Sequence, residues 1–230
     1  MSIPIEVVVL GLITGMTYAL LGIGLVLVYK TSRVINFAHG EMGALPAVLI
    51  PVLVVNHHWN YWPALLVSLL VAAAAGALTE LVVIRKLGSG SRLILMVATI
   101  GASQLFFTLN AFIPRRGRLG RATFPTPFHA SFHIGSLRLT TGELLILLVV
   151  PIVTVALTLF FRSTRVGLAS RAAAENSDAA NLAGIPVRRI SLVVWTVAGL
   201  LAGVSAVLVG PTQPIVTRIA LGPSLMVRAL

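Results

Sequence analysis

The sequence contains no cysteine among its 230 residues. A disulfide framework and a thiolate metal site are therefore excluded. Charged residues are also scarce, since they make up 10% of the chain, whereas a soluble globular domain carries about 25%. This shortage excludes an ordinary soluble domain and indicates a chain that lies in lipid.

The motifs of common catalytic and nucleotide-binding sites are missing as well. The sequence has no G-x-x-x-x-G-K-[ST] loop for nucleotide phosphates, no H-E-x-x-H and no paired carboxylates at helical spacing. His129 and His133 stand four residues apart, a spacing that suits a metal on a helix. Pro125 and Pro127 precede them, however, and favour an extended loop. We therefore predict no enzyme activity and no metal site.

What the chain has instead is apolar length: 57% of its residues are hydrophobic and its mean hydropathy is +1.01. Six continuous apolar segments each hold the roughly 20 residues that a helix needs to cross a membrane. They are Ile5–Tyr29, Val34–Val55, Trp62–Ile84, Leu93–Ile113, Gly142–Phe161 and Ile190–Gly210. The predicted fold is all-α, a polytopic membrane bundle of about six spanning or re-entrant helices in a single domain.

The second apolar segment is the weakest of the six. Pro46 and Pro51 interrupt it, and proline inside a helix removes a backbone hydrogen bond. We expect a kinked or partly re-entrant helix that packs inside the bundle, where freed carbonyls find partners.

The distribution of lysine and arginine predicts the orientation of the bundle. With the N-terminus outside, ten basic residues lie inside, namely Lys30, Arg33, Arg85, Lys86, Arg92, Arg162, Arg165, Arg171, Arg188 and Arg189, against seven outside. The Arg-rich loop 115–121 runs against this trend. Because the basic residues sit at the ends of spans, anionic lipid headgroups explain the net charge of +11 better than nucleic acid does.

Ionisable residues within the spans are few. Glu80 lies about one turn from the inner end of its segment, and we expect its side chain to reach water. Glu143 lies in the first turn of its segment, where the helix dipole favours a carboxylate. No acid is expected at mid-membrane, which argues against a proton-coupled transporter.

Small and weakly polar residues mark candidate packing and transport faces. Gly11 and Gly15, and Gly199 and Gly203, form G-x-x-x-G pairs, for which packing within the same chain is favoured over dimerisation. Hydroxyl and amide side chains on two spans either line a translocation path or bond neighbouring helices. These candidate pore-lining residues are Thr99, Ser103, Asn110, Thr154 and Thr158.

A polar, Arg-rich segment at 162–190 separates two apolar runs. It contains helix formers, and Asn176, Ser177 and Asp178 are suited to cap a second helical turn. Gly184 and Pro186 then end the helix. A short helix held at the membrane face by two spans is typical of a docking element.

Three stretches of the chain resemble the H-type permease subunits of ABC importers for branched-chain amino acids. They are GMTYALLGIGLVLVYK (15–30), VINFAHGEMGAL (34–45), and RVGLASRAAAENSDAANLAGIPVRRI with the following WTVAGLLAG (165–190 and 195–203). The stretches cover about a third of the chain and occur in family order.

The resemblance assigns the 162–190 loop to coupling with ATPase subunits. The general coupling loop of bacterial importers reads E-A-A, then three residues, then Gly. In this chain Asp178 replaces the Glu, while the later Ile-x-Leu-Pro of that pattern is missing. The coupling residues implied are Glu175, Asp178, Ala179, Ala180 and Gly184.

The NFAHGE stretch has a structural and a functional interpretation. Structurally, Asn36 caps the second helix and Glu41 meets the dipole in its first turn, and we rank this interpretation first. Functionally, Asn36, His39 and Glu41 belong to a candidate inner gate.

The resemblance implies an ATP-driven importer in the inner membrane of a bacterium, in which this chain forms half of the pore. The expected partners are a second permease subunit, two cytoplasmic ATPases that hold ATP and Mg²⁺, a periplasmic or lipid-anchored binding protein, and membrane lipid. The chain itself is expected to bind no cofactor. The alternatives are a self-sufficient secondary transporter or channel and, more weakly, a membrane-embedded enzyme.

Relatives of this family continue for about two more spans, so we expect the chain to be incomplete at its C-terminus. On that expectation the stripe of Gly199, Ala202, Gly203 and Ala206 faces helices that the chain lacks. The carried solute, the pairing of the pore and the role of loop 115–121 are not readable from the sequence.

Overall fold

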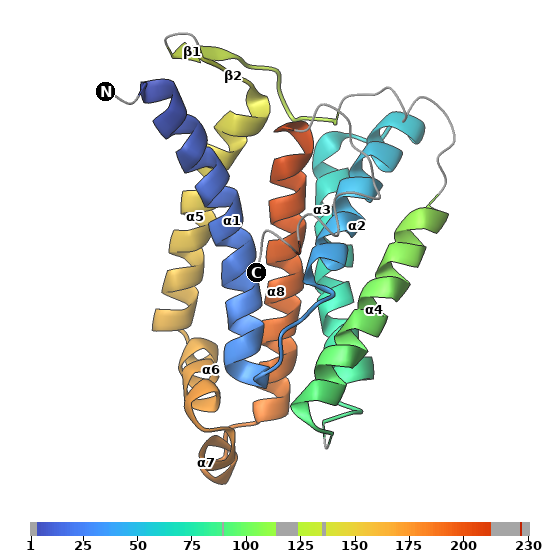
Figure 1. Ribbon diagram of the computed structural model, residues 1–230, viewed down its shortest axis with the longest axis vertical. Helices are drawn as coiled ribbons and strands as arrows, with labels where there is room; N and C mark the ends of the chain where they lie inside the picture. The colour runs from blue at the N-terminus through green and yellow to red at the C-terminus, as the bar shows by residue number, and fades with distance from the viewer. Residues whose placement is uncertain (1–3, 89, 114–123, 135–136, 213–225, 227–230) are drawn as a thin grey trace.

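The computed structural model describes residues 4–88, 90–113, 124–134, 137–212 and 226, and shows a helical bundle (Figure 1). Six helical segments in that part of the chain are long and apolar enough to cross a membrane, which confirms the predicted all-α polytopic bundle. They are α1 (Ile5–Ser32), α2 (His39–Pro51) with the π-helical turn η1 (Val52–Asn56), α3 (Tyr61–Leu78) with the π-helical turn η2 (Thr79–Ile84), α4 (Arg92–Phe112), α5 (Thr141–Ser163), and α8 (Val187–Val209) with the 3-10 turn η4 (Gly210–Thr212).

Four short elements complete the described chain. Two are the helices α6 (Arg165–Glu175) and α7 (Ser177–Leu182), and two are the strands β1 (Phe132–Ile134) and β2 (Leu137–Leu139). The strands pair antiparallel with His133 opposite Arg138, so the 128–134 region is extended as predicted. No group of three or more His, Asp or Glu residues gathers within the described residues.

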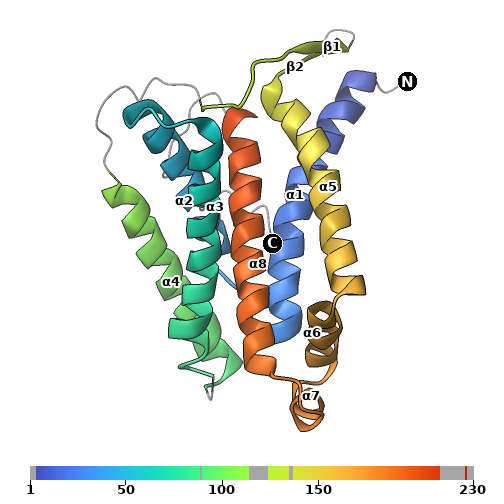
Figure 2. The same cartoon turned by 180° about the vertical axis from the view of Figure 1, so that it is seen from behind.

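Helix α8 forms the centre of the bundle. It packs against α1, α2, α3 and α5, while α4 and α5 lie at opposite sides of the molecule (Figures 1 and 2). Burial follows this arrangement. Within an 18-residue window, 67% of the α8 span is buried, against 22% for α4 and 11% for α5. The apolar outer faces of α4 and α5 are therefore the surfaces suited to lipid or to another subunit.

The G-x-x-x-G pair on α8 allows α3 and α8 to touch through their backbones. A Cβ at Gly199 would overlap the carbonyl oxygen of Ala72, and a Cβ at Gly76 would overlap that of Trp195. Ala202 meets α2, since a Cβ at Gly43 would lie 2.6 Å from the Ala202 carbonyl oxygen. The stripe on α8 thus packs within this chain. The expectation that it faces helices outside the chain is wrong.

The G-x-x-x-G pair on α1 behaves differently. A Cβ added at Gly11 or at Gly15 would meet no atom within 4 Å in the described structure. Internal packing, which we favoured for both pairs, is therefore correct for Gly199 and Gly203 but not for Gly11 and Gly15.

The second apolar segment is helical from His39 to Asn56 without a break, and Pro46 lies inside it. Residues 34–38 form a non-helical approach, so the helix begins later than the apolar run. In its 18-residue window 72% is buried, which confirms the predicted place inside the bundle.

Candidate coupling surface and translocation residues

Helices α6 and α7 lie at one end of the bundle, which also contains Ser32, Arg85, Arg92 and Val187 and is called the coupling end below (Figure 1). The apolar face of α6 joins a buried cluster formed by Ala173, Ile190 and Val194. The short helix pair is therefore a packed part of the bundle.

The α7 helix begins where the sequence predicts. The Asn176 side-chain Oδ1 accepts hydrogen bonds from the backbone N–H groups of Asp178 (3.1 Å) and Ala179 (3.0 Å). These two groups have no partner within the helix, so Asn176 is its N-cap.

The end of α7 is a Schellman turn centred on Gly184. The backbone N–H of Ile185 donates to the Ala180 carbonyl (2.9 Å), and that of Gly184 donates to the Asn181 carbonyl (3.0 Å). Gly184 has φ +83°, the left-handed conformation that this motif needs and that side chains other than glycine rarely adopt. The interpretation of Gly184 as a helix stop is confirmed.

The predicted coupling residues do not share one environment. Glu175, Asp178, Ala179 and Gly184 are exposed, whereas Ala180 is buried. Leu182 was not among the predicted residues, yet its side chain is 91% exposed on α7. An apolar side chain presented so fully beside a fixed turn has the form of a binding anchor. The exposure of this side chain could not be predicted from the sequence, because a leucine in a helix is more often buried.

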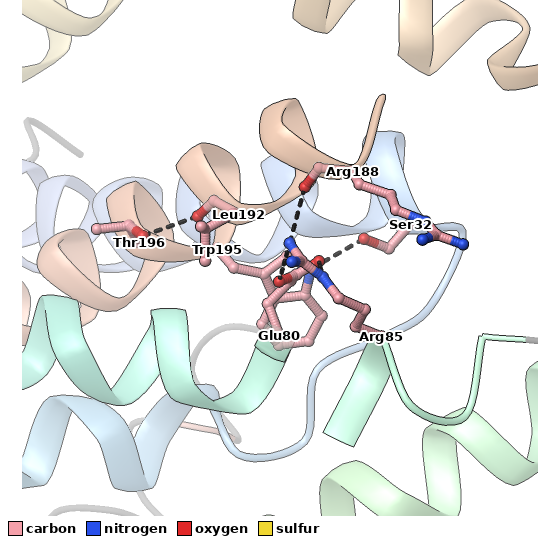
Figure 3. Close-up of polar contacts among 7 residues, drawn as sticks. All are labelled: Ser32, Glu80, Arg85, Arg188, Leu192, Trp195 and Thr196. Carbon is pink, nitrogen blue, oxygen red and sulfur yellow. Dashed lines mark hydrogen bonds and ion pairs between the residues drawn. The ribbon is translucent and has the colours of Figure 1, made fainter. Parts of the chain in front are cut away.

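Two hydrogen bonds fix the coupling end to the spanning helices. The Arg33 Nη2 donates to the Ala174 carbonyl at 2.7 Å, which joins the end of α1 to the end of α6. The Trp195 Nε1 donates to the Ser32 hydroxyl at 2.9 Å, which joins α8 to α1 (Figure 3). Trp195 itself is completely buried.

Glu80 does not reach water as we expected, since it is 2% exposed. The π-helical turn η2 stacks residues that are five apart, and the Arg85 N–H donates to the Glu80 carbonyl at 2.7 Å. The Arg85 guanidinium then pairs with the Glu80 carboxylate at 2.9 Å and also donates to the Arg188 carbonyl at 3.1 Å (Figure 3). The pair therefore links the end of η2 to the start of α8.

The three candidate gate residues are buried at the approach to α2. Asn36 lies two residues before the N-cap position, which Ala38 occupies, and its Oδ1 accepts from the Ala38 N–H at 3.0 Å. Asn36 thus supports the helix start without being its N-cap, which corrects our prediction. Glu41 is buried in the first turn as predicted.

The His39 imidazole fills a slot opposite Gly24. A Cβ at Gly24 would lie 2.7 Å from its Cε1 and 2.9 Å from its Nε2. The ring is 0% exposed, and neither ring nitrogen has a hydrogen-bond partner of good geometry in the described residues, although the backbone of Leu21 lies beside it. A buried polar ring without a hydrogen-bond partner lowers the stability of the fold, so its presence calls for an explanation such as a functional role.

The candidate pore-lining residues divide between two distant helices. On α4, the Thr99 hydroxyl donates to the Met96 carbonyl and accepts from the Phe37 N–H at 3.1 Å, and the Asn110 Nδ2 lies 3.5 Å from the Glu41 carbonyl oxygen. Both residues thus bond neighbouring segments, as one of our two interpretations proposed. Ser103 is half-buried.

The other two candidates lie on α5. Thr154 is half-buried and Thr158 is exposed, and the Thr158 hydroxyl donates to the Thr154 carbonyl within the same helix. Because α4 and α5 are at opposite sides of the bundle (Figure 2), the two groups do not line one path inside this chain. Loop 115–121 lies outside the described residues.

A bundle of six apolar spans, with two short polar helices packed at one end, is the architecture of a multi-pass membrane protein. The chain matches the family model for the branched-chain amino acid transport system / permease component over residues 7–229. It belongs to this family, whose members are transport proteins of the inner membrane and not enzymes.

Curated relatives of the chain come from several bacteria. The chain is 34% identical to the high-affinity branched-chain amino acid transport system permease protein BraD of Pseudomonas aeruginosa, over 87% of this chain and 68% of the relative. With the same coverage it is 31% identical to LivH of Salmonella typhimurium and 32% identical to LivH of Escherichia coli. No solved structure matches.

Proposed function

We propose that this chain is a permease subunit of an ATP-driven importer for branched-chain amino acids or related small amino acids and amides. It forms half of a translocation pore with a second permease subunit. A periplasmic or lipid-anchored binding protein delivers the solute. The names of the relatives, all branched-chain amino acid permeases, support the substrate class.

The observation that carries the proposal is the α7 helix with Leu182 exposed beside the Gly184 turn. One of two cytoplasmic ATPases docks on this helix and the other on the second permease subunit, and ATP and Mg²⁺ bind in the ATPases, so this chain holds no cofactor. Ala179, exposed on the same short helix, keeps the docking face slim enough to enter a groove. Glu175 and Asp178 supply charge at its rim.

His39 and Glu41 belong to an inner gate in this proposal. Both are buried where α2 starts, and the ring of His39, which lies beside the Leu21 backbone without a well-formed hydrogen bond, gains a partner when the helices move. The gate and the docking helix are connected through α1, since Gly24 contacts the His39 slot and Arg33 contacts α6.

Reconstitution tests the proposed function directly. The test uses proteoliposomes that contain this permease, its partner permease, both ATPases and the binding protein. They are expected to accumulate labelled leucine only when ATP is present on the side of the membrane where the ATPases lie. Omitting the ATPases is expected to reduce uptake to the level of empty vesicles. Uptake that continues without ATPases, driven by an ion gradient, would identify a secondary transporter instead.

Accessibility of α7 provides a second test. Because the sequence has no native cysteine, all maleimide labelling reports the introduced one. A Ser177→Cys variant is expected to react with an impermeant maleimide only after the cells are lysed, because the docking helix must face ATP. An Asn60→Cys variant is the matched control, and Asn60 precedes α3 at the opposite end of the bundle. Labelling of Ser177→Cys in intact cells would contradict ATPase docking on α7.

A further inference from the structure

A cavity of about 600 Å³ opens at the coupling end. Its wall is formed by Ser32 at the end of α1, Leu95 on α4, Asn181 on α7 and Arg188 near the start of α8, together with η2 and Lys86 just after it. The volume lies within the range of small-molecule sites, about 300–1,000 Å³, and exceeds what one side chain would occupy. The cavity is therefore large enough for a ligand.

The charges around the cavity are unequal. Its charged wall residues are Glu80, Arg85, Lys86 and Arg188. Arg85 holds the Glu80 carboxylate through Nε at 3.3 Å and Nη2 at 2.9 Å, so these two charges compensate each other. Within the described residues neither Lys86 nor Arg188 forms a salt bridge. Two uncompensated cations remain at the wall.

Hydrogen-bond donors accompany these cations. The Ser32 oxygen accepts from the Trp195 indole, which leaves its own hydroxyl proton available to a ligand. Asn181 and Ser191 also line the cavity, and within the described residues neither side chain forms a hydrogen bond. Cations combined with hydroxyl and amide donors form the usual environment of a bound phosphate group.

The position of the cavity adds a second argument. Its wall is made where α1 ends, where η2 ends and where α8 begins. In the proposed orientation, the ends of these spans lie among the lipid headgroups of the inner face. Basic pockets between spanning helices on that face bind anionic headgroups.

We propose that this cavity binds a phosphate-bearing anion, either the headgroup of an anionic lipid or a free phosphate compound. The bound anion joins α7, through Asn181, to the ends of α1, η2 and α8. It thereby holds the docking helix in place. The site depends on the geometry of the cavity alone, and it does not require that ATPases dock on α7.

The test compares two double variants of the full chain purified in nanodiscs. Lys86→Gln/Arg188→Gln removes the two uncompensated cations. Arg171→Gln/Arg189→Gln is the matched control, because both arginines are exposed at the same end of the bundle and neither lines the cavity. A third variant, Lys86→Arg/Arg188→Lys, keeps the charge and shows whether the region still folds, through its melting temperature without ligand.

Native mass spectrometry with phosphatidylglycerol measures the lipid arm, and thermal stabilisation by inorganic phosphate in phosphatidylcholine nanodiscs measures the free-anion arm. We expect the Lys86→Gln/Arg188→Gln variant to bind the effective probe about tenfold more weakly, with the other two variants close to wild type. Loss in the lipid arm alone identifies a headgroup site, and loss in the phosphate arm identifies a soluble ligand.

The proposal would be overturned if the Lys86→Gln/Arg188→Gln variant bound the probes as well as the Arg171→Gln/Arg189→Gln control does. It would also be overturned if the wild-type chain bound neither phosphatidylglycerol nor inorganic phosphate. A third result would also overturn it. If the Lys86→Gln/Arg188→Gln variant binds both probes normally but loses co-purification with the ATPases, the cavity receives an acidic segment of that partner.

Discussion

Replacing Gly199 by valine is expected to prevent the folded protein from accumulating in the membrane. A Cβ at this position overlaps the Ala72 carbonyl oxygen and lies 3.1 Å from the Gly76 Cα. Both are backbone atoms of α3, so relief requires α3 and α8 to separate. Overpacking of this kind is destabilising by about 3 kcal/mol or more, a large fraction of the roughly 5–15 kcal/mol that stabilises a typical domain.

Fluorescence-detected size-exclusion chromatography of a tagged protein measures this effect. Gly101→Val on α4 is the matched control, since a Cβ there meets nothing within 4 Å and valine has the same modest effect on helix formation at both sites. A Gly199→Val protein that elutes as a sharp peak at the level of Gly101→Val would show that the two helices are not in backbone contact.

Replacing Leu182 by aspartate is expected to abolish solute uptake while the protein still inserts and folds. Leu182 is 91% exposed, so the free subunit does not depend on it for packing. On docking, its apolar surface would be exchanged for a desolvated carboxylate, a change that weakens an interface anchor by about 2–4 kcal/mol. That loss corresponds to a drop of about 30-fold or more in affinity for the ATPases.

Co-purification of the ATPases with a tagged permease measures docking, and uptake of labelled leucine measures coupling. Leu182→Met is the control, because methionine keeps the size and apolar character of the anchor, and it is expected to retain both activities. Normal ATPase recovery with Leu182→Asp would move the docking surface away from α7.

Features with a local cause could be predicted from the sequence. The spans follow from continuous apolar runs, and the structure places their ends within a few residues of the prediction, except at the start of α2. There, residues 34–38 are apolar but not helical. The start of α7 at Asn176 and its end at Gly184 were predictable because capping and a positive φ depend on the residue itself.

Features that depend on distant partners could not be predicted. Gly76 gave no signal as a packing residue, since its role appears only when Trp195 lies against it. The Glu80 carboxylate was expected to reach water because it lies about one turn from the inner end of its span. The π-helical turn instead brings Arg85, five residues further on, over the carboxylate. Thr99 was a candidate for two roles until the position of Phe37 was known.

The hydrogen bond from Arg33 to the Ala174 carbonyl determines how a mechanical load at α7 is distributed. The α6 helix also packs against α1, α5 and α8, so a push on α7 reaches the spanning helices along several contacts. Through the Arg33 hydrogen bond, α6 bears on the end of α1, and the indole of Trp195 ties α1 to α8 through Ser32. A displacement of the docking helix would then act on α1 and α8 together, whereas α4 packs against α2 and η2.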